Sequence, residues 1–484
     1  MEKIKKHCAG LLFIAVYFFL TAYKLIIHVT PFYDWDESIY AQVGREMIRQ
    51  KSYLVPLWQG TPWLDKPPIP SLFYGIVELF PISAEISTRI ATLILGCIAL
   101  FLLYKFIYRI TASRVVSFAT IVITAFLPLF VQRSQALNVD VFLLIGWLGY
   151  TLYEKEMIVS SLFLLLAVLS KSLLGFYAPG MFVLFYSYQL VRKEIGYNMW
   201  WKKMQRIALQ ILFVSLWFVG MTIVYGHTFI QLQFIESHFK RVAASIEQHF
   251  GQRTFYIDIL VDQMKTLIVP AVISTMYLIF LFFKKKKNNI AFLSLFFIPW
   301  FLFLNITKTK IAWYLYPILP QFAFLSAYPL LFFKKNVGLT LIYMGIIFYI
   351  LFSTISPLST FMGSTYATFD DHYYIALDAH GNRCKSLSVL VGGDTRSSYA
   401  VLHKMDLTIT TTTWWGNHPS IAYYADTKTV YDYTLTAFQD HLNQGKPEDC
   451  FIFEKTDEKS LSIPPTSQGM KISNKTYSLI QIKK

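Results

Sequence analysis

The segment AGLLFIAVYFFLTAYKLIIH at residues 9–28 is followed, after a short turn, by DWDESIYAQVGREMIRQ at residues 34–50. The first segment is apolar over a length that crosses the roughly 30 Å hydrocarbon core of a bilayer as a helix. No small-residue cleavage pattern follows Tyr23, so we interpret this segment as a retained helix rather than a signal peptide. In the second segment apolar and charged side chains fall on opposite sides of a helix, which predicts an amphipathic helix at the membrane surface.

The composition of the 484 residues indicates that much more of the chain lies in a membrane. Hydrophobic residues make up 55% and charged residues 15%, against roughly 25% charged residues in soluble globular proteins. The length criterion predicts about eleven transmembrane helices. They are expected near residues 9–28, 90–108, 115–133, 139–153, 157–170, 172–191, 207–226, 264–283, 289–307, 311–333 and 337–356. We therefore expect a mainly α-helical, polytopic membrane protein.

The basic residues follow a positional rule that accounts for the formal net charge of +15. With the N-terminus in the cytoplasm, Lys and Arg gather in the loops on that side, for example at residues 284–287, as the positive-inside rule expects. The charge is therefore not a sign of nucleic-acid binding. An odd number of spans sends the C-terminus outside, where two long loops, residues 29–89 and 227–263, are also expected. A membrane domain of residues 1–356 would thus concentrate its polar side chains on its outer face.

Residues 357–484 are more polar and predict a small extracytoplasmic α/β domain. Strands are expected at 386–391, 406–413, 450–453 and 477–482, and helices at 396–405 and 435–442. The region contains no P-loop and no G-x-G-x-x-G, so nucleotide binding has no support there. Cys384 and Cys450 could form a disulfide in an oxidising compartment, but the sequence leaves their distance open.

The first outer loop carries two groups of residues suited to phosphate chemistry. Asp34 and Glu37 have the spacing of a helix capping box, which does not use Asp36. An Asp-x-Asp pair can also hold a divalent cation through hard oxygen ligands. Farther along, Lys66 lies in the stiff segment WLDKPP at 63–68, where it could pair with a phosphate as a point charge. A prolyl turn with an ordinary exposed ion pair explains the same segment.

The combination of D-E-S-I-Y-A-x-x-x-R-E-M at 36–47 with D-K-P-P at 65–68, just after a first transmembrane helix, resembles the bacterial branch of the protein O-mannosyltransferase family. That branch, of the glycosyltransferase family 39 and 83 types, includes the aminoarabinose transferase of lipid A, and its members have the membrane glycosyltransferase fold called GT-C. Further similar elements are Arg133 with Asp140, Ser170-Lys171-Ser172, and Lys310-Ile311-Ala312-Trp313-Tyr314. Ser172 departs from the family, which usually has a glycine there, and the C-terminal region does not align.

The resemblance implies a glycosyltransferase that moves a sugar from a polyprenyl-phosphate donor to an acceptor at the outer face and inverts the anomeric centre. The acceptor would be a lipid, a glycan or a protein, as in lipid A modification or protein glycosylation. Such chemistry needs a base for an acceptor hydroxyl and positive charge for the leaving phosphate. Asp36 is the expected base, with Glu37 beside it as a second predicted catalytic residue. The predicted donor-phosphate ligands are Lys66, Arg45, Lys240, Arg241, Arg253 and Lys310.

The resemblance also implies a divalent metal, Zn²⁺, Mg²⁺ or Mn²⁺, near the first outer loop. Its expected ligands are Asp65 and His238, the latter in an aromatic-rich segment of the second outer loop. A lone histidine among aromatic residues also fits a packed interfacial side chain, and two ligands are fewer than a closed zinc site needs.

Two other classes of protein share some of these features. A polytopic transporter or lipid flippase would have as many spans, but transporters usually bind near the bilayer midplane and often contain repeated halves. This chain has no detectable repeat, and its polar residues lie in the outer loops. A non-enzymatic membrane module whose outer domain binds an envelope partner is the second alternative, against which the first-loop motifs argue.

Overall fold

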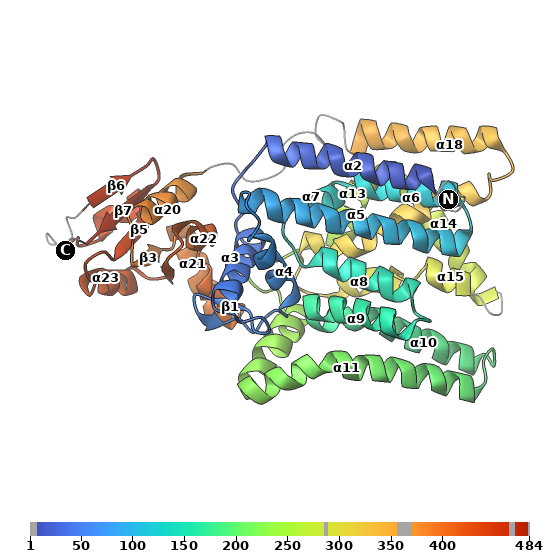
Figure 1. The fold of residues 1–484 in the computed structure, drawn as a ribbon, viewed down its shortest axis with the longest axis horizontal. Helices are drawn as coiled ribbons and strands as arrows, with labels where there is room; N and C mark the ends of the chain where they lie inside the picture. The colour runs from blue at the N-terminus through green and yellow to red at the C-terminus, as the bar shows by residue number, and fades with distance from the viewer. Residues whose placement is uncertain (1–6, 285–288, 356–369, 464–469, 483–484) are drawn as a thin grey trace.

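The structure, a computed structural model, describes residues 7–284, 289–355, 370–463 and 470–482. It contains a bundle of roughly parallel helices and, against one end of that bundle, a smaller α/β unit (Figure 1). The predicted domain boundary at residues 356 and 357 lies outside the described residues. We refer to residues 370–482 as the C-terminal unit.

The bundle and its outer loops contain α-helices joined by turns and by some longer connections. In chain order these are α2 (Cys8–Ile27), α3 (Asp36–Arg49), α4 (Ile69–Val77), α5 (Ala84–Thr111), α6 (Arg114–Phe126), α7 (Pro128–Arg133), α8 (Asp140–Leu152), α9 (Met157–Lys171), α10 (Tyr177–Val191), α11 (Tyr197–Ile230), α12 (Arg241–Ala243), α13 (Phe255–Met264), α14 (Ile268–Lys284), α15 (Asn289–Ser294), α16 (Ile298–Ile306), α17 (Leu319–Ala327) and α18 (Val337–Ile350). Shorter 3-10 or π-helical pieces connect or extend them: η1 (Ser172–Phe176), η2 (Gln231–Lys240), η3 (Lys265–Leu267), η4 (Ala312–Ile318), η5 (Tyr328–Leu331) and η6 (Leu351–Ile355).

Six helical stretches in the described ranges are long and apolar enough to cross a membrane. They are Cys8–Ile27, Ala84–Thr111, Met157–Val191, Tyr197–Ala243, Phe255–Lys284 and Val337–Thr354. The chain is a multi-pass membrane protein. The sequence predicts about eleven spans, and the additional ones coincide with shorter helices such as α6 and α8. One cause is local: α6 ends where Leu127 is extended ahead of Pro128, a conformation that the proline ring favours in the residue before it.

Close packing explains the central position of α8 in the bundle. All of its side chains are buried, including that of Trp147. Gly146 allows α9 to approach, because a Cβ there would lie 2.6 Å from the Cβ of Ala167. Outside the bundle proper, α3 and α4 meet in the same way, since a Cβ on Gly44 would lie 2.4 Å from the carbonyl oxygen of Ser71. The first loop is thus a packed structure rather than a loose connection.

The C-terminal unit is an α/β fold around one mixed sheet with the strand order β4-β3-β5-β7-β6. The strands are β3 (Ser386–Leu390), β4 (Lys428–Asp432), β5 (Cys450–Glu454), β6 (Met470–Ser473) and β7 (Tyr477–Gln481). Helices α20 (Asp371–Gly381), α21 (Gly393–Lys404), α22 (Ser420–Ala425) and α23 (Leu435–Asn443) accompany them, with 3-10 segments η7 (Thr410–Trp414) and η8 (Lys455–Ser460). β3 pairs in parallel with β4 and β5, and the β5–β7 and β6–β7 pairs are antiparallel.

Most of the elements predicted for this unit are confirmed, but one is wrong. The strands at 386–391, 450–453 and 477–482 and the helices at 396–405 and 435–442 correspond to β3, β5, β7, α21 and α23. The predicted strand at 406–413 is instead a coil that leads into η7, because its threonines make hydrogen bonds to the loops of the bundle. Cys384 and Cys450 are joined by a disulfide.

The C-terminal unit packs against the end of the bundle at which the first outer loop lies, and the first helix starts at the opposite end (Figure 1). A hairpin of β1 (Leu57–Trp58) and β2 (Thr61–Pro62) in that loop contributes to the contact. Trp415 lies against both Trp58 and Trp63, with ring centroids 4.5 and 5.5 Å away. The hydroxyl of Tyr424 accepts a hydrogen bond of 2.7 Å from the backbone N–H of Phe32.

Candidate active site

Asp36 is the first residue of α3, and the backbone ahead of it is unusual. Trp35 has φ 71° and ψ −113°, a region that residues other than glycine rarely occupy. Such strain is found at functional sites, where the surrounding structure holds it in place. The Asp36 side chain is 29% exposed, and its Oδ2 lies 3.0 Å from Nη2 of Arg133 at the end of α7.

Asp36 is one end of a row of alternating charges. The same Nη2 of Arg133 donates to Oδ2 of Asp140 at 3.1 Å, and the other oxygen of Asp140 is bonded to Lys171 at the end of α9. Asp140, Arg133 and Lys171 are buried. Tyr314 lies beneath the ammonium group of Lys171, 4.4 Å from ring centroid to Nζ. Buried charges need partners of this kind, and only Asp36 in the row is substantially exposed.

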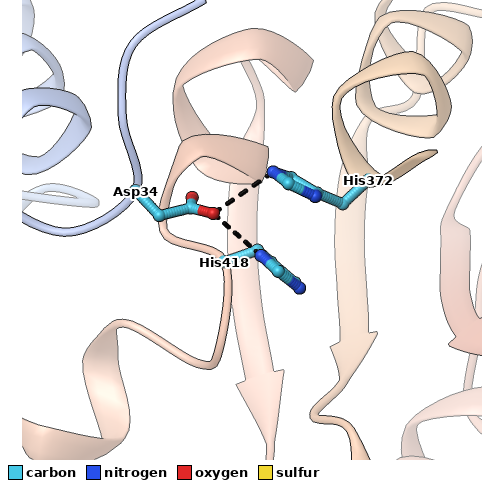
Figure 2. A group of neighbouring side chains, drawn as sticks. All are labelled: Asp34, His372 and His418. Carbon is cyan, nitrogen blue, oxygen red and sulfur yellow. Dashed lines mark hydrogen bonds and ion pairs between the residues drawn. The ribbon is translucent and has the colours of Figure 1, made fainter. Parts of the chain in front are cut away.

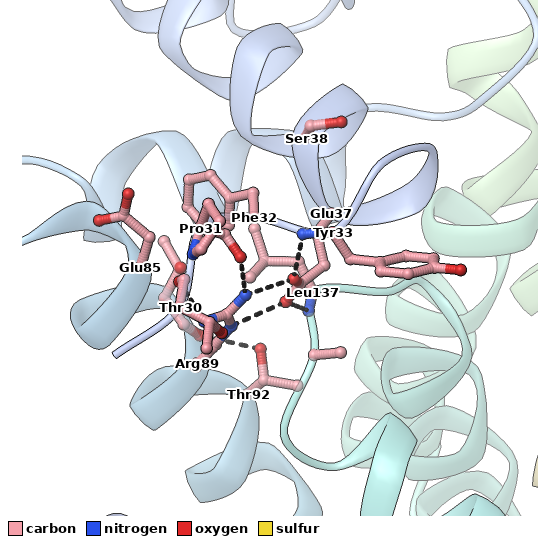
Figure 3. Close-up of polar contacts among 12 residues, drawn as sticks. Thr30, Pro31, Phe32, Tyr33, Glu37, Ser38, Glu85, Arg89, Thr92 and Leu137 are labelled. Atoms are coloured by element: carbon pink, nitrogen blue, oxygen red, sulfur yellow. Dashed lines mark hydrogen bonds and ion pairs between the residues drawn. The ribbon is translucent and has the colours of Figure 1, made fainter. Parts of the chain in front are cut away.

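Glu37 belongs to a separate, fully buried network (Figure 3). Its carboxylate binds Arg89 through Nη2 at 2.6 Å and Nε at 3.1 Å. It also accepts hydrogen bonds from the backbone N–H groups of Leu137 at 3.1 Å and Tyr33 at 2.9 Å. The same guanidinium donates to the carbonyl oxygens of Thr30 and Pro31. This network joins α3, α5 and the turn before α8, so the geometry favours a structural role for Glu37 over the predicted catalytic one.

The surroundings of Arg45 also differ from those expected for a ligand of the donor phosphate. Its guanidinium lies 3.5 Å from the ring centroid of Tyr423 and donates to the Tyr423 carbonyl oxygen at 2.8 Å. Carboxylates of Glu78 and Asp426 lie 3.6 and 3.4 Å from it. Arg45 therefore attaches α3 to the C-terminal unit, and its position does not support phosphate binding.

Lys66 lies at the centre of the predicted donor site. Burial lowers the pKa of its ammonium group to about 8, and the positive charges of Arg241 and Lys171 act in the same direction. The charges of Asp65 and Asp36 oppose that shift. A cation that is desolvated and close to other cations gains most from an anionic ligand. Among the predicted phosphate ligands, Arg241 is the one whose charge acts on Lys66.

The predicted metal ligands, Asp65 and His238, belong to one hydrogen-bonded group. Nδ1 of His238 lies 2.7 Å from the carbonyl oxygen of Gln233, whose side-chain amide donates to the carbonyl oxygen of Asp65 at 3.3 Å. The His238 ring also makes a backbone hydrogen bond at Lys171, which a metal at the second ring nitrogen would replace. Burial raises the pKa of the Asp65 carboxyl, whose Oδ2 accepts a hydrogen bond from Thr411 at 2.6 Å. The two residues are linked through Gln233, and a cation held by them would add to the positive charges of Lys66 and Arg241 that already act on the Asp65 carboxylate.

The other predicted cations are occupied elsewhere or lie at the surface. Lys240 donates to Asp406 at 2.8 Å and so attaches η2 to the C-terminal unit. Nζ of Lys310 donates to two carbonyl oxygens at the end of α16, at 3.1 and 3.2 Å. Arg253 is exposed. Arg241 is partly neutralised by Glu247 at 2.9 Å. The geometry does not support the predicted phosphate contacts of Lys240 and Lys310.

The C-terminal unit supplies residues that the sequence analysis missed. In η7, Thr410 donates to Glu236, Thr411 to Asp65 and Thr412 to Glu247, each through its hydroxyl, at 2.6–3.1 Å. Threonine hydroxyls of one short segment thus reach carboxylates of both outer loops. The run TITTTTW at 408–414 is a visible signal, but its β-branched composition predicts a strand.

Two solved membrane transferases have this architecture. The crystal structure of ArnT from Cupriavidus metallidurans, bound to undecaprenyl phosphate, superposes with a TM-score of 0.69 at 13% identity, covering 97% of each chain. The oligosaccharyltransferase AglB from Archaeoglobus fulgidus, in complex with an inhibitory peptide and a dolichol-phosphate, gives 0.58 at 12% identity, covering 94% of this chain and 70% of that one. The chain has the GT-C fold.

Comparisons of the sequence give less information than these structures do. No family model matches it. An uncharacterized protein of Aquifex aeolicus is 27% identical over 310 residues, which are 60% of this chain and 58% of that protein. The chain thus spans less than two thirds of this curated relative.

An oligosaccharyltransferase from Archaeoglobus fulgidus has also been solved in complex with Zn and sulfate. It superposes with a TM-score of 0.56 at 12% identity, covering 92% of this chain and 68% of that one.

Proposed function

We propose that this chain is an integral membrane glycosyltransferase that moves a sugar from a polyprenyl-phosphate donor to an acceptor at the extracytoplasmic face, with inversion. The observation that carries the proposal is that the partly exposed carboxylate of Asp36 and the half-buried cation Arg241 both act electrostatically on the half-buried Lys66. Solved structures with this fold hold undecaprenyl phosphate and dolichol-phosphate. Both are polyprenyl phosphates, the class of lipid carrier expected for the donor.

The reaction requires one bond to form while another breaks. The acceptor hydroxyl oxygen attacks the anomeric carbon, the bond from that carbon to the phosphate oxygen breaks, and the hydroxyl proton passes to the Asp36 carboxylate. Arg133 orients this carboxylate at 3.0 Å, which places the base before the acceptor arrives. An ordinary carboxylate is a weak base, so it takes the proton late, as the oxygen attacks.

The departing polyprenyl phosphate needs positive charge, which Lys66 and Arg241 supply. Both are partly withdrawn from solvent, where an ion pair with phosphate is stronger than in water. A divalent cation held by Asp65 and His238 would add charge for the same leaving group. The lipid tail would remain in the bilayer between helices while its phosphate reaches these side chains.

Several finer features belong to the same proposal. The donor sugar is a hexose or a pentose, and the acceptor is a hydroxyl or phosphate of a lipid, a glycan or a protein. The N-terminus lies in the cytoplasm, and the C-terminal unit lies outside the cell membrane, because the basic loops favour that orientation.

The transporter alternative gains no support from the arrangement. The start of α3, where Asp36 lies, is at the end of the bundle next to the C-terminal unit (Figure 1), whereas transporters usually bind near the midplane.

The test uses the full chain in lipid, a panel of polyprenyl-phosphate hexoses and pentoses, and crude envelope acceptors. Release of free polyprenyl phosphate is measured for the wild type and for Asp36→Asn. Release that depends on Asp36 supports the transferase. Movement of the lipid across vesicles without any release from the donors would support the transporter instead.

A further inference from the structure

A second group of potential metal ligands lies between the bundle and the C-terminal unit (Figure 2). Asp34 comes from the turn before α3, His372 from the first turn of α20, and His418 from the turn before α22. Oδ2 of Asp34 lies 2.8 Å from Nδ1 of His418 and 3.2 Å from Nε2 of His372. The three potential ligand atoms lie within 4.8 Å of one another. Their side chains are 13–25% exposed, which leaves a path for an ion to enter.

The spacing of these atoms is close to that of a tetrahedral zinc site. Zinc ligands lie at about 2.0–2.1 Å from the metal, so tetrahedral geometry separates neighbouring ligand atoms by about 3.3 Å. The oxygen–nitrogen separations are 2.8 and 3.2 Å, so the carboxylate and the two stacked rings would move slightly apart to accept an ion. Two imidazoles and one carboxylate are a common set for zinc with a fourth, open position.

The surroundings of Asp34 also suit a ligand. Its Oδ1 accepts a hydrogen bond of 3.2 Å from the backbone N–H of Ser420, which orients the carboxylate as outer hydrogen bonds orient metal ligands.

The two imidazole rings are stacked, with centroids 3.9 Å apart and planes 13° apart, and both direct a nitrogen at the same carboxylate oxygen. A neutral imidazole can donate one hydrogen bond to that oxygen, and its other tautomer offers a lone pair to a cation from the same nitrogen. Counting bound metal distinguishes the two arrangements.

We propose that Asp34, His372 and His418 bind one Zn²⁺, with water in the fourth position, and that this ion fastens the C-terminal unit to the first outer loop. The site is separate from Asp65 and His238. Its consequence for the chemistry follows from the chain: Asp34 is two residues before Asp36, across the strained Trp35. An ion that fixes Asp34 therefore also fixes the turn from which Asp36 begins.

The experiment measures zinc per chain in tag-free, full-length protein in lipid. The protein is treated with a chelator, incubated with Zn²⁺ and desalted, and bound metal is counted by mass spectrometry. His372→Ala and His418→Ala should each lose one zinc equivalent relative to the wild type. His403→Ala, which alters an exposed histidine of the same unit, should leave the zinc count unchanged, and adding His418→Ala to His238→Ala should still remove one equivalent. A wild type without this equivalent, or a double His372→Ala, His418→Ala variant that keeps it, would overturn the site.

A second variant covers the case in which the alanine variants do not fold. His418→Cys keeps a zinc ligand at that position, so it should still bind one equivalent. With Co²⁺ as the probe, its spectrum should acquire a sulfur-to-cobalt charge-transfer band that the wild type lacks. Bound Co²⁺ without this band would show that residue 418 does not touch the metal, and would overturn the proposal. Both readouts are independent of transferase activity, so a failure here is distinct from a failure of the proposed function.

Discussion

Oδ2 of Asp36 and Nη2 of Arg133 lie 3.0 Å apart, and the same guanidinium nitrogen is shared with the buried Asp140. The proposed base, Asp36, is thus held by Arg133, and the buried carboxylate of Asp140 balances the charge of this guanidinium. Asp36 is 29% exposed while the Asp140 side chain is 1% exposed. An acceptor can reach Asp36 without breaking the buried part of the row.

The first prediction concerns Asp36→Asn. The amide has the shape of the carboxylate but cannot accept the acceptor proton, so transfer should fall by at least about 100-fold, in the range that general-base catalysis contributes. The apparent melting temperature should stay close to that of the wild type, because the side chain is partly exposed. Release of polyprenyl phosphate measures the first outcome, and thermal unfolding in detergent measures the second. Normal turnover would remove Asp36 from the mechanism.

The second prediction is the opposite pattern for the neighbouring Glu37→Gln. The change leaves the buried guanidinium of Arg89 without its countercharge, and breaking a buried ion pair in this way costs about 3–5 kcal/mol. We expect a clearly lower melting temperature and a lower yield of folded protein. If the variant had normal thermal stability and no transferase activity, Glu37 would be catalytic after all. Asp36→Asn is the matched control, since it alters the adjacent carboxylate.

The third prediction concerns donor binding by Lys66. Removing its ammonium group in Lys66→Ala should raise the KM for the polyprenyl-phosphate donor by roughly 10-fold or more, because a charge-assisted contact to phosphate contributes about 1.5–3 kcal/mol. Initial rates over a range of donor concentrations measure it. Lys404→Ala, an exposed lysine on the C-terminal unit, should leave the KM unchanged. An unchanged KM and rate for Lys66→Ala would exclude its phosphate role.

The contacts of Arg133 and Arg45 differ in how far the sequence alone could predict them. Arg133 ends α7 and Asp140 begins α8. Because they are close in the sequence, their pairing could be inferred from the sequence alone. The contact of Arg133 with Asp36 joins residues 97 positions apart, and only the tertiary fold brings it about. Arg45 shows the limit more sharply, since its partner Tyr423 is 378 positions away. A basic residue beside a motif does not reveal whether its partner is a ligand or another part of the protein.

The secondary structure was predictable wherever local preference and tertiary packing agree. The apolar helices and the strands β3, β5 and β7 follow directly from periodicity. Residues 406–413 have a strand-like composition, but the hydroxyls of η7 bond to the outer loops instead, and that gain outweighs a weak β-propensity. The histidine pair could not be found either, because His372 and His418 have no recognisable spacing in the chain.

The fourth prediction concerns pH and Glu78, which lies where α4 meets the C-terminal unit. Burial raises the pKa of Glu78 to about 7, even though Arg45 and Tyr423 favour the charged form. The unfolded chain has the ordinary lower pKa, so between these two values the folded state binds more protons than the unfolded state. Stability linked to this group is therefore present at low pH and is lost as pH rises through about 7.

The glutamine side chain in Glu78→Gln cannot ionise, so this variant does not lose stability at residue 78 as the pH rises. Its melting temperature relative to the wild type should rise from pH 5 to pH 8 and then level off. Glu156→Gln, which alters an exposed glutamate just before α9, should give a difference that does not change with pH. Thermal unfolding of the three proteins in one buffer series measures both. A difference for Glu78→Gln that falls with pH would mean that the carboxylate is stabilised in the folded state, and that its contact with Arg45 outweighs the cost of its burial.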